Sequence, residues 1–302
     1  MRKFLMTLAA VVALGGPAAA QADPNRLFAD SEMVIRDRFS AEVIGTGPDV
    51  VLIPGLASSR ATWRATAERL RRSHRLHLIQ VAGFAGEPAR ANSEGEVLAP
   101  TADAIAAYLV EQRLAPATIV GHSLGGTMIL DLAQRRPEVL KKALVVDALP
   151  FLGGMQDPKA TAESVKPMAA RMRDAMISAK SSATAANLEP QMRGMSKDAA
   201  TRTLVAEWGA ASDRKVVARM MYEDMVLDLR PRLGEIRTPI LLLYPDNTPL
   251  NVPSGMMEKL YPALYAAAPT VTPKPVADSQ HFVMLDQPEA FAAALEEFLS
   301  RP

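Results

Sequence analysis

The sequence predicts an α/β fold in which helices cover both faces of a mostly parallel, doubly wound sheet. Short β-branched runs alternate with helical segments, Gly and Pro follow the ends of these runs, and one long helical stretch interrupts the alternation. Compact apolar runs bounded by turn residues are typical of buried strands. Their alternation with helices is typical of βαβ crossovers, which lay strands parallel to one another.

The predicted elements follow one another at regular spacing. Two short alternating segments, 33–35 and 39–44, are expected to pair as edge strands. Turn residues then separate the buried strands from the helices. We expect strands at 50–53, 76–81, 118–120, 143–146 and 240–243, helices at 60–70, 100–112, 127–134 and 288–299, and a last short strand and loop at 276–282.

The long helical stretch lies between two of the predicted strands. Over residues 150–232 strand-like runs disappear and methionines accumulate. We interpret it as a helical cap inserted into a core formed by residues 23–149 and 233–302. Methionine commonly fills helical cores, but it also lines adaptable apolar pockets, and both readings stay open for this stretch.

The first 22 residues have the layout of a secretory signal. A basic start at Arg2 and Lys3 precedes an apolar run and then small residues, with cleavage expected after Ala20 or Ala22. The protein is therefore expected to be exported, to the periplasm or the medium, without stable membrane insertion after cleavage.

Composition excludes several classes of function. With 49% hydrophobic and 22% charged residues the chain is globular, and a net charge of +1 gives no reason to expect a nucleic-acid partner. Because there is no cysteine, thiol nucleophiles, thiolate metal sites and iron–sulfur clusters are excluded.

The most specific motif is the segment GHSLGG at residues 121–126, between a predicted strand and a predicted helix. It matches G-x-S-x-G in the strand–turn–helix context that the motif requires. Such a sharp turn projects the Ser123 hydroxyl from the sheet edge. Gly121 and Gly125 are expected there because a Cβ would collide with neighbours in the turn.

With this motif the chain resembles the α/β-hydrolase superfamily, and the segment SQHFVMLDQPE at 279–289 resembles its catalytic-histidine loop. The resemblance implies Ser123 as nucleophile and His281, after the last strand, as base. Two other histidines, His74 and His77, flank a predicted strand and are expected at a surface or a strand edge. We expect His122 to have a structural role.

The acid that orients the base has two candidates. In most relatives it follows the strand that resumes after the cap, where the best-matching position is Thr248, which carries no carboxylate. Asp246 stands two residues earlier. In other relatives the acid follows the preceding strand, which here ends at Asp147. We favour Asp147 and keep Asp246 as the alternative.

Acyl transfer also needs backbone amides to bind the developing oxyanion. One is expected from Leu124, directly after the nucleophile. The other is expected from Leu56, in the loop after the early strand, where Pro54-Gly55 replaces the His-Gly pair of many relatives.

These residues predict a serine hydrolase, with a carboxylesterase acting on small to medium apolar acyl substrates as the leading assignment. No metal or organic cofactor is expected. An amidase, a peptidase or a C–C bond hydrolase would use the same triad, and a non-catalytic ligand-binding protein of this fold is a further alternative. The sequence predicts neither the natural substrate nor the oligomeric state.

Overall fold

The computed structural model describes residues 26–155, 157, 159–180, 183–246 and 255–301. The predicted signal segment, residues 1–22, and Thr248 lie outside these described residues. None of the described helices is long and apolar enough to cross a membrane.

The core is one sheet of eight strands in the order β1-β2-β4-β3-β5-β6-β7-β8. All neighbours from β4 to β8 pair in parallel, whereas β2 is antiparallel to both β1 and β4. The predicted mostly parallel α/β sheet is confirmed. The strands are β1 Glu32–Ile35, β2 Phe39–Gly45, β3 Asp49–Ile53, β4 Arg75–Val81, β5 Ala117–His122, β6 Leu140–Val146, β7 Ile240–Pro245 and β8 Val271–Val276.

Two strand predictions need correction. β2 is not an edge strand, because it pairs with β4 as well as with β1. Its polar residues Ser40 and Glu42 are fully buried. The last strand ends at Val276 rather than beginning there. Pro273 and Pro275 concealed it, since proline is tolerated in a strand at the edge of a sheet, which is where β8 lies.

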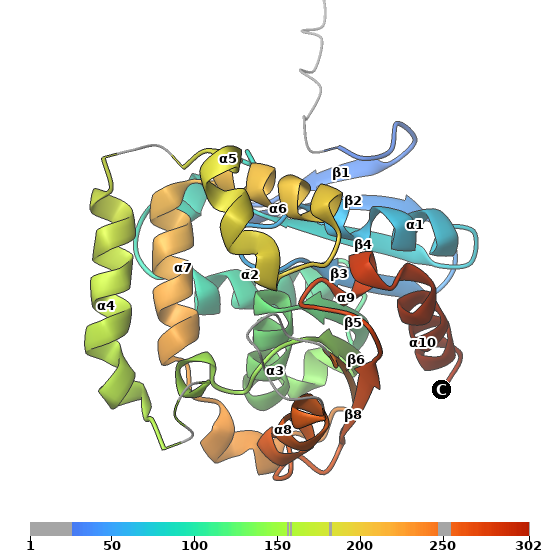
Figure 1. The fold of residues 1–302 in the computed structure, drawn as a ribbon. Coiled ribbons are helices and arrows are strands. Elements are labelled where there is room, and N and C mark those ends of the chain that lie inside the picture. Colours follow the sequence, from blue (N-terminus) through green and yellow to red (C-terminus); the bar gives the residue numbers. More distant parts are fainter. Residues whose placement is uncertain (1–25, 156, 158, 181–182, 247–254, 302) are drawn as a thin grey trace, which may run out of the picture.

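Apolar layers form on both faces of the sheet because successive side chains of each strand alternate in direction. On β3, Val51 and Ile53 face one cluster while Val50 and Leu52 face the other. Figure 1 shows α1 and α10 on one side of the sheet and α2 and α3 on the other. The flanking helices are η1 Arg60–Trp63, α1 Arg64–Leu70, η2 Arg90–Ser93, α2 Leu98–Glu111, α3 Leu124–Arg135, η3 Pro137–Val139, α8 Met256–Leu264, α9 Val283–Asp286 and α10 Pro288–Ser300.

Between β6 and β7 the described residues form helices and loops but no strand, and we call residues 150–232 the helical insertion. Threonine or aspartate side chains cap α4 to α7 at their first turns, which fixes where these helices begin. The fully buried Val216 and Met220 of α7 pack into the core, and α4 lies beside α7 (Figure 1). The helices are η4 Leu152–Gly154, α4 Ala162–Ser178, α5 Ala185–Leu188, η5 Glu189–Gly194, α6 Ala199–Ala211, α7 Arg214–Val226 and η6 Arg230–Glu235.

Candidate active site

Ser123 occupies a strained turn between β5 and α3. Its backbone angles are φ 52° and ψ −119°, a combination that residues with a Cβ rarely adopt. The turn is tied to the neighbouring strand, because the Ser123 amide donates to the Val146 carbonyl at 2.8 Å. Backbone strain of this kind is typical of functional sites, where the surrounding structure holds one side chain in a fixed direction.

The two glycines around Ser123 are required by close packing rather than by their own backbone angles. A Cβ on Gly121 would lie 2.5 Å from the Gly125 carbonyl oxygen, and a Cβ on Gly125 would lie 2.4 Å from the Ile53 carbonyl oxygen. Both contacts are with backbone, which cannot move aside cheaply. Gly125 therefore lets the first turn of α3 rest on the end of β3.

His281 and Asp147 meet at the carboxyl edge of the sheet. His281 Nδ1 lies 2.6 Å from Asp147 Oδ2, a short charge-assisted contact. Asp147 directly follows β6 with a positive φ of 46°, and its amide donates to the Leu243 carbonyl at 2.8 Å. The Tyr261 hydroxyl donates to the other oxygen, Asp147 Oδ1. Tyr261, from α8, had no signal in the sequence.

The second candidate acid, Asp246, is not joined to the imidazole. Its carboxylate oxygen Oδ1 accepts a hydrogen bond from the Asp278 amide at 2.7 Å, three residues before His281. Of the two carboxylates that the sequence left open, the structure brings Asp147 to the His281 ring. Asp246 instead binds the backbone of the loop that carries His281.

His122 is fully enclosed beside His281. Its Nε2 lies 2.9 Å from the His281 carbonyl oxygen, so Nε2 must carry the hydrogen and donate. The two rings lie 4.5 Å apart. Burial, with a smaller contribution from the charge of His281, holds the pKa of His122 well below its usual range. His122 is therefore a neutral donor to the backbone of the loop.

The remaining histidines lie elsewhere. His77, in β4, is buried rather than exposed, and its ring contacts Asp49 and the Tyr108 hydroxyl. Within the described residues no hydrogen bond joins the Ser123 hydroxyl to a histidine ring. In unliganded hydrolases this contact is often long and shortens only when substrate binds.

The proposed oxyanion donors lie on two segments that touch. Leu124 is the first residue of α3, where amides lack a partner within the helix. Leu56 belongs to the loop after β3. A Cβ on Gly55, its neighbour, would lie 3.1 Å from Ser123 Cβ, so this loop runs directly against the serine. The loop that carries Leu56 and the first turn of α3 therefore both adjoin Ser123.

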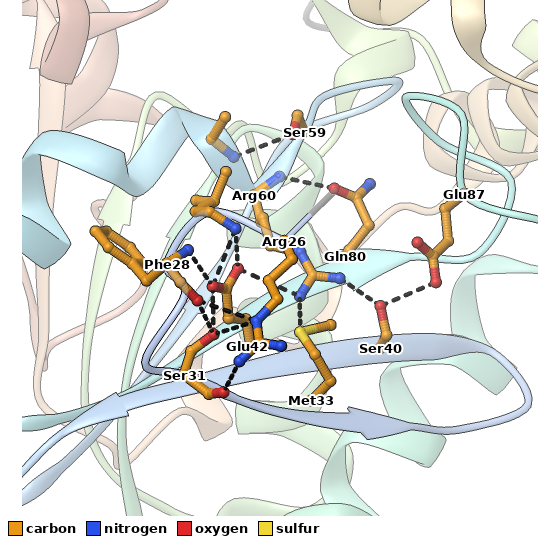
Figure 2. Close-up of polar contacts among 12 residues, drawn as sticks. Arg26, Phe28, Ser31, Met33, Ser40, Glu42, Ser59, Arg60, Gln80 and Glu87 are labelled. Atoms are coloured by element: carbon orange, nitrogen blue, oxygen red, sulfur yellow. Dashed lines mark hydrogen bonds and ion pairs between the residues drawn. The ribbon is translucent and has the colours of Figure 1, made fainter. Parts of the chain in front are cut away.

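A buried polar network holds the end of the loop after β3, at Ser58 and Arg60 (Figure 2). Gln80 of β4 accepts from the Arg60 amide at 2.8 Å and donates to the Ser58 carbonyl at 3.2 Å. The fully buried Arg60 and Glu42 side chains form an ion pair at 3.8 Å. Glu42 also accepts from the Phe28 amide at 2.7 Å. Sequence reasoning missed this support, because nothing local distinguishes a buried arginine from an exposed one.

The described residues contain no group of three or more His, Asp or Glu side chains that could hold a metal ion. The site consists instead of a strained serine, an imidazole–carboxylate pair and adjacent backbone amides, all following parallel strands at one sheet edge. Ligands of α/β sheets bind at this edge. Such a set can perform nucleophilic acyl transfer.

Comparison with known proteins extends this picture. The alpha/beta hydrolase family profile matches residues 50–294. A pimeloyl-[acyl-carrier protein] methyl ester esterase of Aeromonas salmonicida is 35% identical over 111 residues, 37% of this chain and 42% of that relative. The match thus spans less than half of that relative's length. A relative of the same name from Nitrosospira multiformis is 25% identical over 272 residues, 85% of this chain and 96% of that relative.

Solved structures share the fold. A hydrolase from Pseudomonas aeruginosa matches with a TM-score of 0.70 and 18% identity, covering 90% of this chain and 99% of that one. The enol-lactonase of Burkholderia xenovorans matches with a TM-score of 0.69 and 16% identity, covering 87% and 96%. Together with the family profile, these likenesses establish that the chain belongs to the alpha/beta hydrolase family.

Proposed function

We propose that the chain is a serine esterase that cleaves carboxylic esters of small to medium apolar acyl substrates. The observation that carries the proposal is the 2.6 Å contact between Asp147 and His281, at the same sheet edge as the strained Ser123. The names of the esterase relatives add support from outside the structure.

In the first half-reaction, Ser123 Oγ attacks the ester carbonyl carbon while His281 Nε2 takes the hydroxyl proton. Asp147 keeps the hydrogen on Nδ1, so that Nε2 is free to accept. The amides of Leu56 and Leu124 bind the oxygen that becomes negative. His281 then returns the proton to the leaving alcohol, and an acyl-enzyme remains.

In the second half-reaction, water replaces the alcohol. His281 removes a proton from water, the hydroxide attacks the acyl-enzyme, and the proton returns to Ser123 Oγ as the acid leaves. Each step uses only the chain's own acid, base and amide donors, so this mechanism needs no metal or organic cofactor.

Two observations support the proposed substrate class. Leu56 and Leu149, which follow β3 and β6, are only partly buried and border the apolar core at this edge. The two relatives are named pimeloyl-[acyl-carrier protein] methyl ester esterases. We therefore propose an ester of a small alcohol and an apolar acyl group.

The proposal is tested by hydrolysis of p-nitrophenyl esters of increasing acyl length, with Ser123→Ala as the inactive reference. We expect turnover that disappears in Ser123→Ala and labelling of Ser123 by a fluorophosphonate. No turnover at any chain length, with an unreactive serine, would refute the esterase and favour the ligand-binding alternative. Faster cleavage of the matched anilides would instead indicate an amidase.

We also propose that residues 1–22 direct export and are removed, as their sequence suggests. Cell fractionation with mass spectrometry of the N-terminus tests this. A cytosolic chain that retains Met1 would contradict it.

A further inference from the structure

The loop that carries His281, residues 277–282, is held through its backbone by groups from four separate parts of the fold. We call it the histidine loop. Each partner contacts a different residue within five consecutive positions. The bonds join the Asp278 amide to Asp246 Oδ1 at 2.7 Å, the Gln280 amide to Asp286 Oδ2 at 2.8 Å, His122 Nε2 to the His281 carbonyl at 2.9 Å, and the Phe282 amide to the Met195 carbonyl at 3.0 Å.

Asp286 makes two of the contacts around this loop at once. Its Oδ2 accepts from the amide of Gln280, the residue immediately before the base. Its Oδ1 accepts from the hydroxyl of Ser196, which lies between η5 and α6 of the helical insertion and is fully buried. One carboxylate therefore joins the histidine loop to the insertion.

The insertion reaches the loop a second time through the neighbouring residue. The Met195 carbonyl accepts from the amide of Phe282, directly after the base. The residues on both sides of His281 are thus fixed by Met195 and Ser196, one directly and the other through Asp286. A shift of this part of the insertion must move the backbone of the base.

Position matters here because the imidazole has to meet both Asp147 and the Ser123 hydroxyl. The Asp147 contact spans 2.6 Å and leaves little tolerance. A misplacement of about 1 Å in a catalytic group lowers rates by roughly 100-fold. Contacts that hold the histidine loop can therefore control the rate without touching the substrate.

We propose that Asp286 is a positioning residue, which couples the helical insertion to the catalytic base by binding Ser196 and the Gln280 amide together. This inference rests on the proposed function of the site. It assigns the helical insertion a part in the chemical step. Ser196 is the residue through which the helical insertion binds Asp286.

The kinetic test compares Asp286→Ala, which removes both contacts, with Asp286→Asn, which can keep both. The asparagine oxygen can accept from the Gln280 amide, and its NH₂ group can donate to the Ser196 hydroxyl. Asp286→Ala should lower kcat about 100-fold with KM changed less than about threefold, and Asp286→Asn should recover most of that loss. Ser196→Ala, which removes only the hydrogen bond from the helical insertion to Asp286, should lower kcat by about tenfold at most.

Lys197→Ala is the matched control. Lys197 stands next to Ser196 and contacts the same loop, but only through an exposed ion pair with Asp278. Such pairs contribute little, so its kcat should stay within about twofold of the parent. In a His281→Ala background, Asp286→Ala should have no further effect, because two changes that act through one group are not additive. An undiminished effect in that background would overturn the proposal.

A spectroscopic readout separates this inference from the proposed function. The hydrogen that His281 Nδ1 shares with Asp147 should give a far-downfield proton resonance, which needs no substrate. We expect it to be lost or broadened in Asp286→Ala and Ser196→Ala, with unchanged circular dichroism, and retained in Lys197→Ala. An intact resonance in both Ser196→Ala and Asp286→Ala would overturn the proposal, even if the chain proves to be no esterase. If Asp286→Ala does not fold, Ser196→Ala decides alone.

Discussion

The sharpest prediction concerns Asp147→Asn. The change replaces the carboxylate 2.6 Å from His281 Nδ1 with a neutral amide of the same shape. Two losses follow. The imidazolium that forms when Ser123 is deprotonated no longer has a counter-charge. The amide hydrogen of asparagine also favours the tautomer with the proton on Nε2, which then cannot accept the serine proton.

The geometry sets the size of the effect. The Asp147 side chain is 10% exposed and that of His281 24%. At an effective dielectric constant of about 20, and with the two delocalised charges centred roughly 4 Å apart, the pair contributes about 4 kcal/mol. At about 1.4 kcal/mol for each factor of ten, this is a loss of about 1,000-fold, and the wrong tautomer should bring the loss in kcat to about 10,000-fold.

The assay measures kcat and KM for one short-chain p-nitrophenyl ester, with Asp246→Asn as the matched control. Asp246 binds the Asp278 amide rather than the imidazole, so its variant should lose less than about tenfold in kcat. KM should change little in either variant, because in the proposed mechanism neither carboxylate binds the substrate. The reasoning is refuted if Asp147→Asn keeps more than a tenth of the parent kcat, or if Asp246→Asn is the more damaged of the two.

Three further predictions concern stability. Gly125→Ala should lower the free energy of unfolding by about 3 kcal/mol, since its Cβ would lie 2.4 Å from a backbone carbonyl oxygen. Gly209→Ala is the control, because its Cβ meets only a leucine methyl group at 3.2 Å and should leave the protein equally or more stable. Thermal unfolding measures both. Burial raises the pKa of Asp224 to about 6, above the usual value of an aspartate, so the folded state holds this proton more tightly than the unfolded state. Stability therefore falls as pH rises from about 4 to 6. Asp224→Asn should therefore be more stable than the parent by up to about 3 kcal/mol at pH 7 and no more stable than the parent at pH 4. Urea unfolding measures both differences, and a variant no more stable than the parent at pH 7 would contradict this. Glu42→Gln removes the carboxylate that pairs with the buried Arg60 side chain and should lower the free energy of unfolding by roughly 3 kcal/mol. An unchanged urea midpoint would contradict this.

The parts of the fold that could be predicted are those whose cause is local. β-Branched runs between turn residues located β3 to β7, and the glycine pattern around Ser123 located the turn before α3. The helix begins at Leu124, three residues earlier than the apolar spacing predicted, because the strand ends at His122 and Ser123 is the only residue between them. β8 was misplaced because its prolines oppose strand formation everywhere except at an edge, and the sequence does not mark which strand is the edge.

The parts of the candidate site that could not be predicted depend on contacts between distant segments. The sequence offered Asp147 and Asp246 as nearly equal candidates, since each follows a strand of the same sheet edge. Only the path of the histidine loop distinguishes them. Tyr261 and Asp286 were missed for the same reason, because a tyrosine in one helix and an aspartate in another carry no signal of what they will touch.

Asp147 and Asp246, the two carboxylates at this sheet edge, have different roles toward the catalytic base. The acid after β6 binds the imidazole, so in the proposed mechanism Asp147 sets the charge and tautomer of the base. The carboxylate after β7 is then free to bind the backbone at Asp278, and it helps to fix where the imidazole stands. Although the acid follows β6 rather than β7, the carboxylate after β7 still has a structural role. Asp246 belongs with Asp286 among the groups that hold the histidine loop. If so, Asp246→Asn, which can keep an acceptor for the Asp278 amide, should retain more activity than Asp246→Ala, an order that a residue acting through its charge on the base would not produce.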